Sequence, residues 1–276
     1  MDAVKPGKPQ RPRRKGAPRS NSGPAARFAF VQSLERGLAV IKSFGEHKPE
    51  QTLSQVADAT GLDRAAARRF LLTLERLGYV EQNGRSFRLR PQTLQLGYAY
   101  LSSLPWWQNA QRVAERLADK FGQNCAIGVL DGHQVLYVAY ASAARFPVLN
   151  RSVGTHLPAF ATAIGRLLLA GLDPAALHER LSSGGLEKLT PHTVVDRTKI
   201  ARILAEIRSN RYAFVDQELE IGLRSIGVPI VNRRGELLAA MSISIIDSRM
   251  SRAAIVDRYL EPLQTASREI TDALAT

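Results

Sequence analysis

Residues 52–89 constrain the fold more than any other stretch, because they follow the order of a winged helix-turn-helix. Three apolar residues have the spacing of one buried helical face: Leu53, Val56 and Ala57. Thr52 can cap the start of this helix, Gly61 supplies the turn that ends it, and Asp63 can cap the next helix. Apolar residues then recur with the same helical period: Ala67, Phe70, Leu71, Leu74 and Leu77. The pattern predicts two helices joined by a tight turn.

The front of the second predicted helix is basic. Opposite its apolar residues it carries four arginines: Arg64, Arg68, Arg69 and Arg76. A helix with a packed back and arginines near its N-terminus is suited to reading the major groove of DNA.

A hairpin is predicted directly after this helix. Tyr79–Gln82 and Phe87–Leu89 are strand-like and flank an Asn83-Gly84 turn. Such a wing places Arg85 and Arg88 beside the phosphate backbone. The residues predicted to contact DNA are therefore Thr52, Arg64, Ala65, Arg68, Arg69, Arg85 and Arg88. The alternative is an ordinary helical hairpin with a solvated basic face.

Charge is concentrated at the N-terminal end of the chain. The 276 residues carry a net charge of +13, and residues 1–27 hold eight Lys or Arg against Asp2 alone. This segment is rich in proline and glycine and cannot bury a core, so a disordered basic arm is predicted. Its role is either phosphate attraction or that of an inert solubilising tail.

The composition also limits where the chain works. Its single cysteine, Cys125, excludes an internal disulfide and lies in an apolar run that favours a buried thiol. The apolar stretches are too short to span a bilayer, and the N-terminus lacks the apolar core of a secretory signal. A cytoplasmic protein without a membrane partner is expected.

Four segments are predicted along the chain. After the arm at 1–27 come the DNA-binding domain at 28–91, a linker helix at 92–104 and a second domain at 105–276. The DNA-binding domain begins with a helix over Ser33–Phe44, with four residues on one face: Leu34, Leu38, Ile41 and Phe44. The linker helix carries more apolar residues than a solvated spacer needs, which favours packing between subunits.

The second domain alternates strands and helices. Four β-rich runs are predicted: Asn124–Leu130, Gln134–Tyr140, Ser225–Val231 and Leu237–Ile246. They pair as two hairpins, with helices between and after them, which is typical of an α+β domain with an antiparallel sheet.

No enzymatic motif is found. The chain lacks the glycine-rich nucleotide loops and the nucleophile elbow of hydrolases. Its five histidines never fall at metal-ligand spacing. A non-enzyme without metal or cofactor is expected.

A ligand site is predicted in the second domain. Small residues run from Gly154 to Gly165 into a helix, whose positive N-terminal end favours an anion. Tight packing of the helix on the sheet would explain these residues equally well. Ser242 and Ser244, however, alternate with apolar residues, so both hydroxyls face the same side of a strand.

These stretches resemble the IclR family of bacterial regulators. The resemblance rests on FVQSLERGLAVIKSF, LSQVADATGLDRAAARRFLLTLERLGYV, SVGTHLPAFATAIGRLLLA and DQELEIGLRSIGVPI. It is strongest to the branch that controls protocatechuate and 4-hydroxybenzoate catabolism. It implies a GAF-like effector domain that binds a small organic acid, and assembly as dimers or tetramers.

By position, the family's effector contacts fall on Ala163, Ile164, Ser225, Ser242 and Ser244. A position that is acidic in the family falls on Val215, which makes the site more apolar and suits an aromatic ring. Further candidates lie near these positions: Arg145, Phe146, His156, Thr162 and Arg224. Arg145 or His156 could pair with the effector's carboxylate, and so could Arg151 or Arg224.

The function expected from the sequence is control of aromatic-acid catabolic genes by a DNA-binding regulator. Its partners would be double-stranded operator DNA, protocatechuate or 4-hydroxybenzoate, and a second copy of the chain. The alternatives are a family member that senses another organic acid, an architectural DNA-binding protein, and an enzyme fused to a DNA-binding module.

Overall fold

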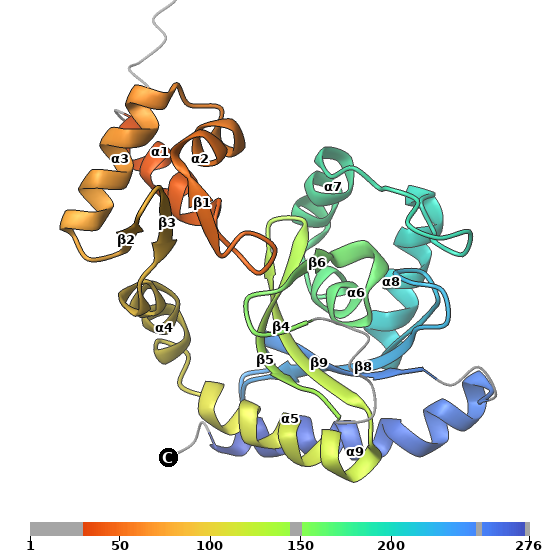
Figure 1. Cartoon of the computed structure of the whole chain (residues 1–276). Helices are drawn as coiled ribbons and strands as arrows, with labels where there is room; N and C mark the ends of the chain where they lie inside the picture. The colour runs from red at the N-terminus through yellow and green to blue at the C-terminus, as the bar shows by residue number, and fades with distance from the viewer. Residues whose placement is uncertain (1–29, 144–150, 247–249, 274–276) are drawn as a thin grey trace, which may run out of the picture. The chain divides into compact units, whose positions relative to one another are not determined.

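The computed structural model describes residues 30–143, 151–246 and 250–273. These residues form two compact units that divide between Thr93 and Leu94, and each unit is described by itself (Figure 1). The predicted basic arm at 1–27 and two candidate site residues, Arg145 and Phe146, lie outside the described residues.

The first unit is a winged helix-turn-helix. Its helices are α1 (Gln32–Lys42), α2 (Leu53–Thr60) and α3 (Arg64–Arg76). Its antiparallel sheet has the order β1 (Glu50–Thr52), β3 (Ser86–Leu89) and β2 (Val80–Asn83). Both predicted caps are present, since Thr52 and Gln55 form a capping box at α2 and Asp63 accepts the Ala66 amide at α3.

The helices pack on a small core that differs from the prediction at α1. The buried side chains come from all three helices and the wing: Val40, Phe44, Val56, Leu71, Leu74, Val80 and Phe87. Leu34 and Leu38, predicted to lie on the buried face, are instead 63% and 43% exposed. The helical period could not place this face correctly, because α1 has apolar residues on more than one side.

The second unit contains a six-stranded antiparallel sheet. Its order is β6 (His156–Pro158), β5 (Gln134–Ala141), β4 (Asn124–Asp131), β9 (Leu237–Ile245), β8 (Arg224–Val231) and β7 (Ala213–Asp216). The α+β prediction is confirmed. The sequence reading missed the short strands β1, β6 and β7, of three, three and four residues.

Helices cover both faces of this sheet (Figure 1). On one face α5 (Trp107–Phe121) and α9 (Arg252–Asp272) bury Ile226, Met241 and Ile243. On the other, α6 (Ala163–Ala170) and α8 (Arg197–Asn210) pack against Ala126, Tyr137 and Ala240. The short helices α4 (Leu94–Ser102), α7 (Pro174–Ser183) and the 3₁₀ turns at Pro91–Thr93 and Ala159–Ala161 complete the described elements.

Cys125 faces the core between the sheet, α5 and α9. Its thiol is fully buried, and burial raises its pKa to about 12. A thiol in this setting stays protonated and unreactive. The predicted burial of Cys125 is confirmed.

Candidate nucleic-acid interface and ligand cavity

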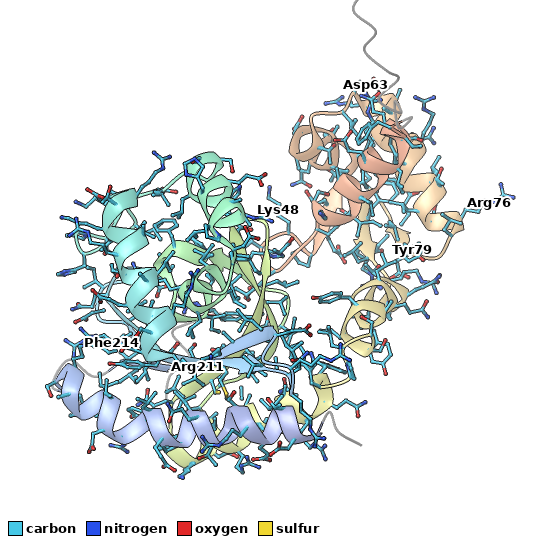
Figure 2. All side chains as sticks on the ribbon, turned by 180° about the vertical axis from the view of Figure 1, so that it is seen from behind. Lys48, Asp63, Arg76, Tyr79, Arg211 and Phe214 are labelled. Carbon is cyan, nitrogen blue, oxygen red and sulfur yellow. The ribbon has the colours of Figure 1, made fainter. Side chains whose placement is uncertain are left out.

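The basic face of α3 is open to solvent. Asp63 Oδ1 accepts the Ala66 amide at 2.7 Å, which fixes the start of the helix. Four predicted DNA-contacting residues in the first turns are all exposed: Arg64, Ala65, Arg68 and Arg69. Figure 2 shows Asp63 and Arg76 toward opposite ends of α3, with the Arg76 side chain reaching into solvent. This leaves the N-terminal arginines accessible to a polyanion.

The wing holds two arginines in different electrostatic settings. Arg85 is exposed in the turn beside Gly84, whose φ of 60° lies in the left-handed region. Arg88 lies on β3 and donates from Nε to Glu81 Oε1 at 2.5 Å, with Glu50 at 3.7 Å. The hydrogen bond to Glu81 raises the pKa of the Arg88 guanidinium. Two carboxylates already neutralise Arg88, so Arg85 is the freer cation.

A small cavity in the second unit, of about 10 Å³, lies between the sheet and the start of α6. It is lined by Tyr137, Arg151, Ala161, Thr162, Ala163, Ile164, Val215, Leu219, Leu223, Ser225, Ser242 and Ser244. Six of the ten predicted effector contacts therefore lie around one space: Thr162, Ala163, Ile164, Ser225, Ser242 and Ser244. Their functional role remains a prediction.

The cavity is lined by groups that can bind an anion. Thr162 caps α6, and its Oγ1 accepts the Gly165 amide at 3.1 Å. The amides of Ala163 and Ile164 lie at the start of the helix. They have no carbonyl one turn earlier within the helix to accept their hydrogen bonds. Ser242 and Ser244, which carry hydroxyls, line the same cavity as these two residues.

Gly165 has a packing role instead. A Cβ at this position would lie 2.1 Å from the Ala159 carbonyl oxygen, so no larger residue fits. For this glycine, the alternative of tight packing accounts for the small residue.

Among the described residues that line the cavity, Arg151 is the one arginine. Its side chain is only 7% exposed and forms an ion pair with Glu220, whose side chain is 48% exposed. Tyr137 lies in the same cavity, and burial raises its pKa to about 12, although the Arg151 charge partly opposes that rise. The Tyr137 hydroxyl thus stays protonated and available as a donor.

A β-bulge explains why two tyrosines lie on this side of the sheet. The register between β4 and β5 shifts at Ile127 and Gly128, so Val138 and Ala139 both face the α5 and α9 core. Tyr137 and Tyr140 therefore share the opposite face and stack with ring centroids 6.0 Å apart.

A buried ion pair anchors the cavity wall. Arg166, in the second turn of α6, donates to Glu218 Oε2 at 2.7 Å and to the Phe160 carbonyl at 2.8 Å. Both side chains are less than a tenth exposed, at 2% and 8%. Glu218 also accepts the Val194 amide at 2.8 Å. The pair ties α6 to the 216–223 loop, which contributes Leu219 and Leu223 to the cavity.

Two predicted effector residues lie elsewhere. His156 is on the edge strand β6, where its Nε2 lies 3.1 Å from Asp131 Oδ2. Arg224 donates to Asp216 at 2.8 Å and to the Met250 carbonyl at 2.6 Å. Neither lines the cavity, so the structure does not bring them together with the serines.

Sequence reasoning named Arg151 as one of four possible carboxylate partners, included Ala161 in the small-residue segment, and missed Tyr137, Leu219 and Leu223. These residues come from a strand, a 3₁₀ turn and a loop that converge only in the fold. The one available signal was the proximity of Arg151 to the small-residue segment that begins at Gly154.

The described residues form neither a metal centre nor a membrane-spanning helix. They contain no group of three or more His, Cys, Asp or Glu side chains that could hold a metal ion. No helix within them is both long and apolar enough to cross a membrane.

Comparison with known proteins defines the class of the chain as a bacterial transcriptional regulator. Residues 33–84 match the IclR helix-turn-helix domain, and residues 98–272 match the C-terminal domain of bacterial IclR transcriptional regulators. The chain belongs to the IclR family, which confirms the resemblance.

Individual relatives agree. The chain is 40% identical over 242 residues to the Pca regulon regulatory protein of Pseudomonas putida, covering 87% of this chain and 83% of that protein. It is 32% identical over 246 residues to the p-hydroxybenzoate hydroxylase transcriptional activator of Acinetobacter baylyi, covering 87% and 91%. A solved double mutant of the PobR inducer-binding domain from Acinetobacter, in complex with 3-hydroxybenzoic acid, is 30% identical with a TM-score of 0.54, covering 59% of this chain and 95% of that one.

Proposed function

We propose that the second unit binds a monocyclic aromatic carboxylate, with protocatechuate and 4-hydroxybenzoate as the leading effectors, and that binding changes the operator affinity of the first unit. The observation that carries this proposal is the cavity. It combines a nearly buried arginine, a helix start and serine hydroxyls with the apolar side chains of Ile164, Val215 and Leu223. A charged head and an apolar ring need both kinds of group.

The relatives support the ligand class. One relative is named as the transcriptional activator of p-hydroxybenzoate hydroxylase, and a related inducer-binding domain was solved in complex with 3-hydroxybenzoic acid. Val215 favours a ring over an aliphatic acid, because it presents a buried apolar side chain to the cavity. An IclR-type regulator of another small organic acid is the second candidate, supported by the polar groups alone.

Roles on the DNA side divide between base and phosphate contacts. Arg64, Arg68 and Arg69 on exposed α3 would read or clamp the major groove. Arg85 and the start of α2 at Thr52 would hold phosphates. Arg88 is less suited to a phosphate contact, since it already forms ion pairs with Glu81 and Glu50.

A homodimer or a pair of dimers would form the working regulator. One short helix reads too few base pairs for operator-level specificity. The helix α4 supports this assembly, because none of its side chains is buried and its apolar residues stay open: Leu94, Leu96, Tyr98 and Tyr100. We assign residues 92–104 as the linker between a DNA-binding domain at 28–91 and an effector domain at 105–276.

Calorimetry on the full chain tests the ligand class. Protocatechuate and 4-hydroxybenzoate are titrated beside glyoxylate, an aliphatic control. Binding of an aromatic acid but not glyoxylate is the expected result. Binding of glyoxylate alone would contradict the aromatic assignment and favour the second candidate.

A further inference from the structure

Two arginine–glutamate pairs hold the 216–223 loop, and they differ in burial. Arg166 and Glu218 are both buried, which makes their pair a permanent anchor. The Arg151 side chain is also nearly buried, at 7% exposure, but its partner Glu220 is 48% exposed. The second pair therefore joins a cation facing the cavity to a carboxylate that water can solvate.

We propose that Glu220 is a removable latch, which the carboxylate of the effector displaces from Arg151. This inference rests on the proposed function. A nearly buried guanidinium needs an anionic partner, and the effector carboxylate supplies one from inside the cavity. Glu220 is released to water at small cost, because its side chain is already 48% exposed and Arg151 keeps an anionic partner throughout. One carboxylate replaces another, so the charge around Arg151 is conserved.

The loop can transmit this exchange. Its ends are fixed by the buried Glu218 and by the hydrogen bond from the Gln217 amide to the Leu223 carbonyl at 2.8 Å. Glu220 lies between these anchors, and its carbonyl accepts the Leu223 amide at 3.2 Å, so its side chain can be released while the loop backbone stays in place. Leu219 and Leu223, on either side of Glu220, line the cavity and would pack on the ring. Binding thus replaces the Glu220 carboxylate at Arg151 with that of the effector and adds packing of the ring against the loop.

The latch gives an unusual expectation: removing a negative charge beside the cavity strengthens binding. Glu220→Gln keeps the shape but deletes the competing charge, so the dissociation constant for 4-hydroxybenzoate should fall about three- to tenfold. The matched control is Glu269→Gln. Glu269 pairs with Arg116 between α5 and α9, is 42% exposed, and lies outside the cavity. It should leave the dissociation constant unchanged.

An uncharged probe shows how much of the effect of Glu220→Gln depends on the carboxylate of the effector. For 4-hydroxybenzamide, which cannot compete for Arg151 as an anion, Glu220→Gln should change affinity by less than about twofold. In an Arg151→Gln background, Glu220→Gln should no longer tighten binding of the acid, because the contested cation is gone. Calorimetry on folded full-length protein measures binding of the acid to Glu220→Gln, binding of the amide to Glu220→Gln, and binding of the acid in the Arg151→Gln background.

The outcomes separate the latch from the proposed function. Tighter binding of the acid alone, abolished in the Arg151→Gln background, supports the latch. Unchanged or weaker binding of the acid by Glu220→Gln overturns it and leaves the aromatic ligand class standing. Failure of folded wild-type protein to bind either probe or protocatechuate overturns the proposed function, and the latch with it.

Discussion

The two units use arginine in opposite ways. On α3, Arg64, Arg68 and Arg69 are exposed, and none takes part in a salt bridge with the described residues. In the second unit, Arg151 and Arg166 are nearly buried, and each is paired with a glutamate. Exposed, unpaired cations suit a large anion that arrives from solution, such as DNA. Buried, paired cations set the shape of a cavity and select what enters it.

The largest expected effect comes from the buried pair. Arg166→Met would leave the Glu218 carboxylate buried without its partner, which costs about 3–5 kcal/mol of unfolding free energy. Arg116→Met breaks a pair whose side chains are 55% and 42% exposed, and should cost about 0–1 kcal/mol. Urea unfolding of both variants measures the difference. Equal losses would show that burial does not distinguish these pairs.

The second largest effect is expected on ligand binding, from the serine hydroxyls that line the cavity. Ser242→Ala or Ser244→Ala removes a buried hydroxyl that lines the cavity, which should cost about 1.5–3 kcal/mol of binding free energy. This corresponds to a roughly ten- to hundredfold higher dissociation constant. The control is Ser267→Ala, since Ser267 is also buried but donates to the Pro229 carbonyl at 2.7 Å on the other face of the sheet. A comparable loss in this control would remove the special role of the cavity serines.

In the DNA-binding unit, the loss of DNA affinity should depend on whether the replaced arginine contacts a base or a phosphate. Arg69→Ala should weaken operator binding by about 1–3 kcal/mol if Arg69 contacts a base edge. Arg85→Ala should weaken all sequences alike and lower the slope of log affinity against log salt by about 0.9. Binding to operator and scrambled DNA at several salt concentrations separates them. Equal losses on both DNAs for both variants would contradict this division.

Tyr137 gives the smallest effect, seen only at high pH. Its pKa rises on folding from 10.0 to about 12, so the folded state keeps a proton that the unfolded state loses. This stability is present below pH 10 and is lost as the pH rises toward 12. Tyr137→Phe should therefore reduce the loss of unfolding free energy between pH 9 and 11 by about 1 kcal/mol. Identical losses in both proteins would show that Tyr137 titrates normally when folded.

Local signals explain which parts could be predicted from the sequence. The caps at Thr52 and Asp63 and the left-handed Gly61 are encoded within a few residues, so α2 and α3 were readable. The serine face of β9 was readable because strand alternation is also local. The three-residue strand β1 was missed, since only its pairing with β3, more than thirty residues away in the chain, defines it.

The cavity could be predicted only in part, for the same reason. Alternation alone would put Tyr137 and Tyr140 on opposite faces, and only the bulge against β4 brings them together. His156 and Arg151 were both plausible cations near the small-residue segment. The pairing of β6 with β5 carries His156 to the sheet edge, beside Asp131, whereas Arg151 points into the cavity.

The central claim is that one ligand couples the two units, and reciprocity tests it most directly. If an aromatic acid changes operator affinity, the operator must change the affinity for that acid by the same factor. Operator binding is measured with and without saturating 4-hydroxybenzoate or protocatechuate, and acid binding is measured with and without operator DNA. We predict equal factors of about five or more in both directions. Binding of the acid with no change in operator affinity would contradict the account.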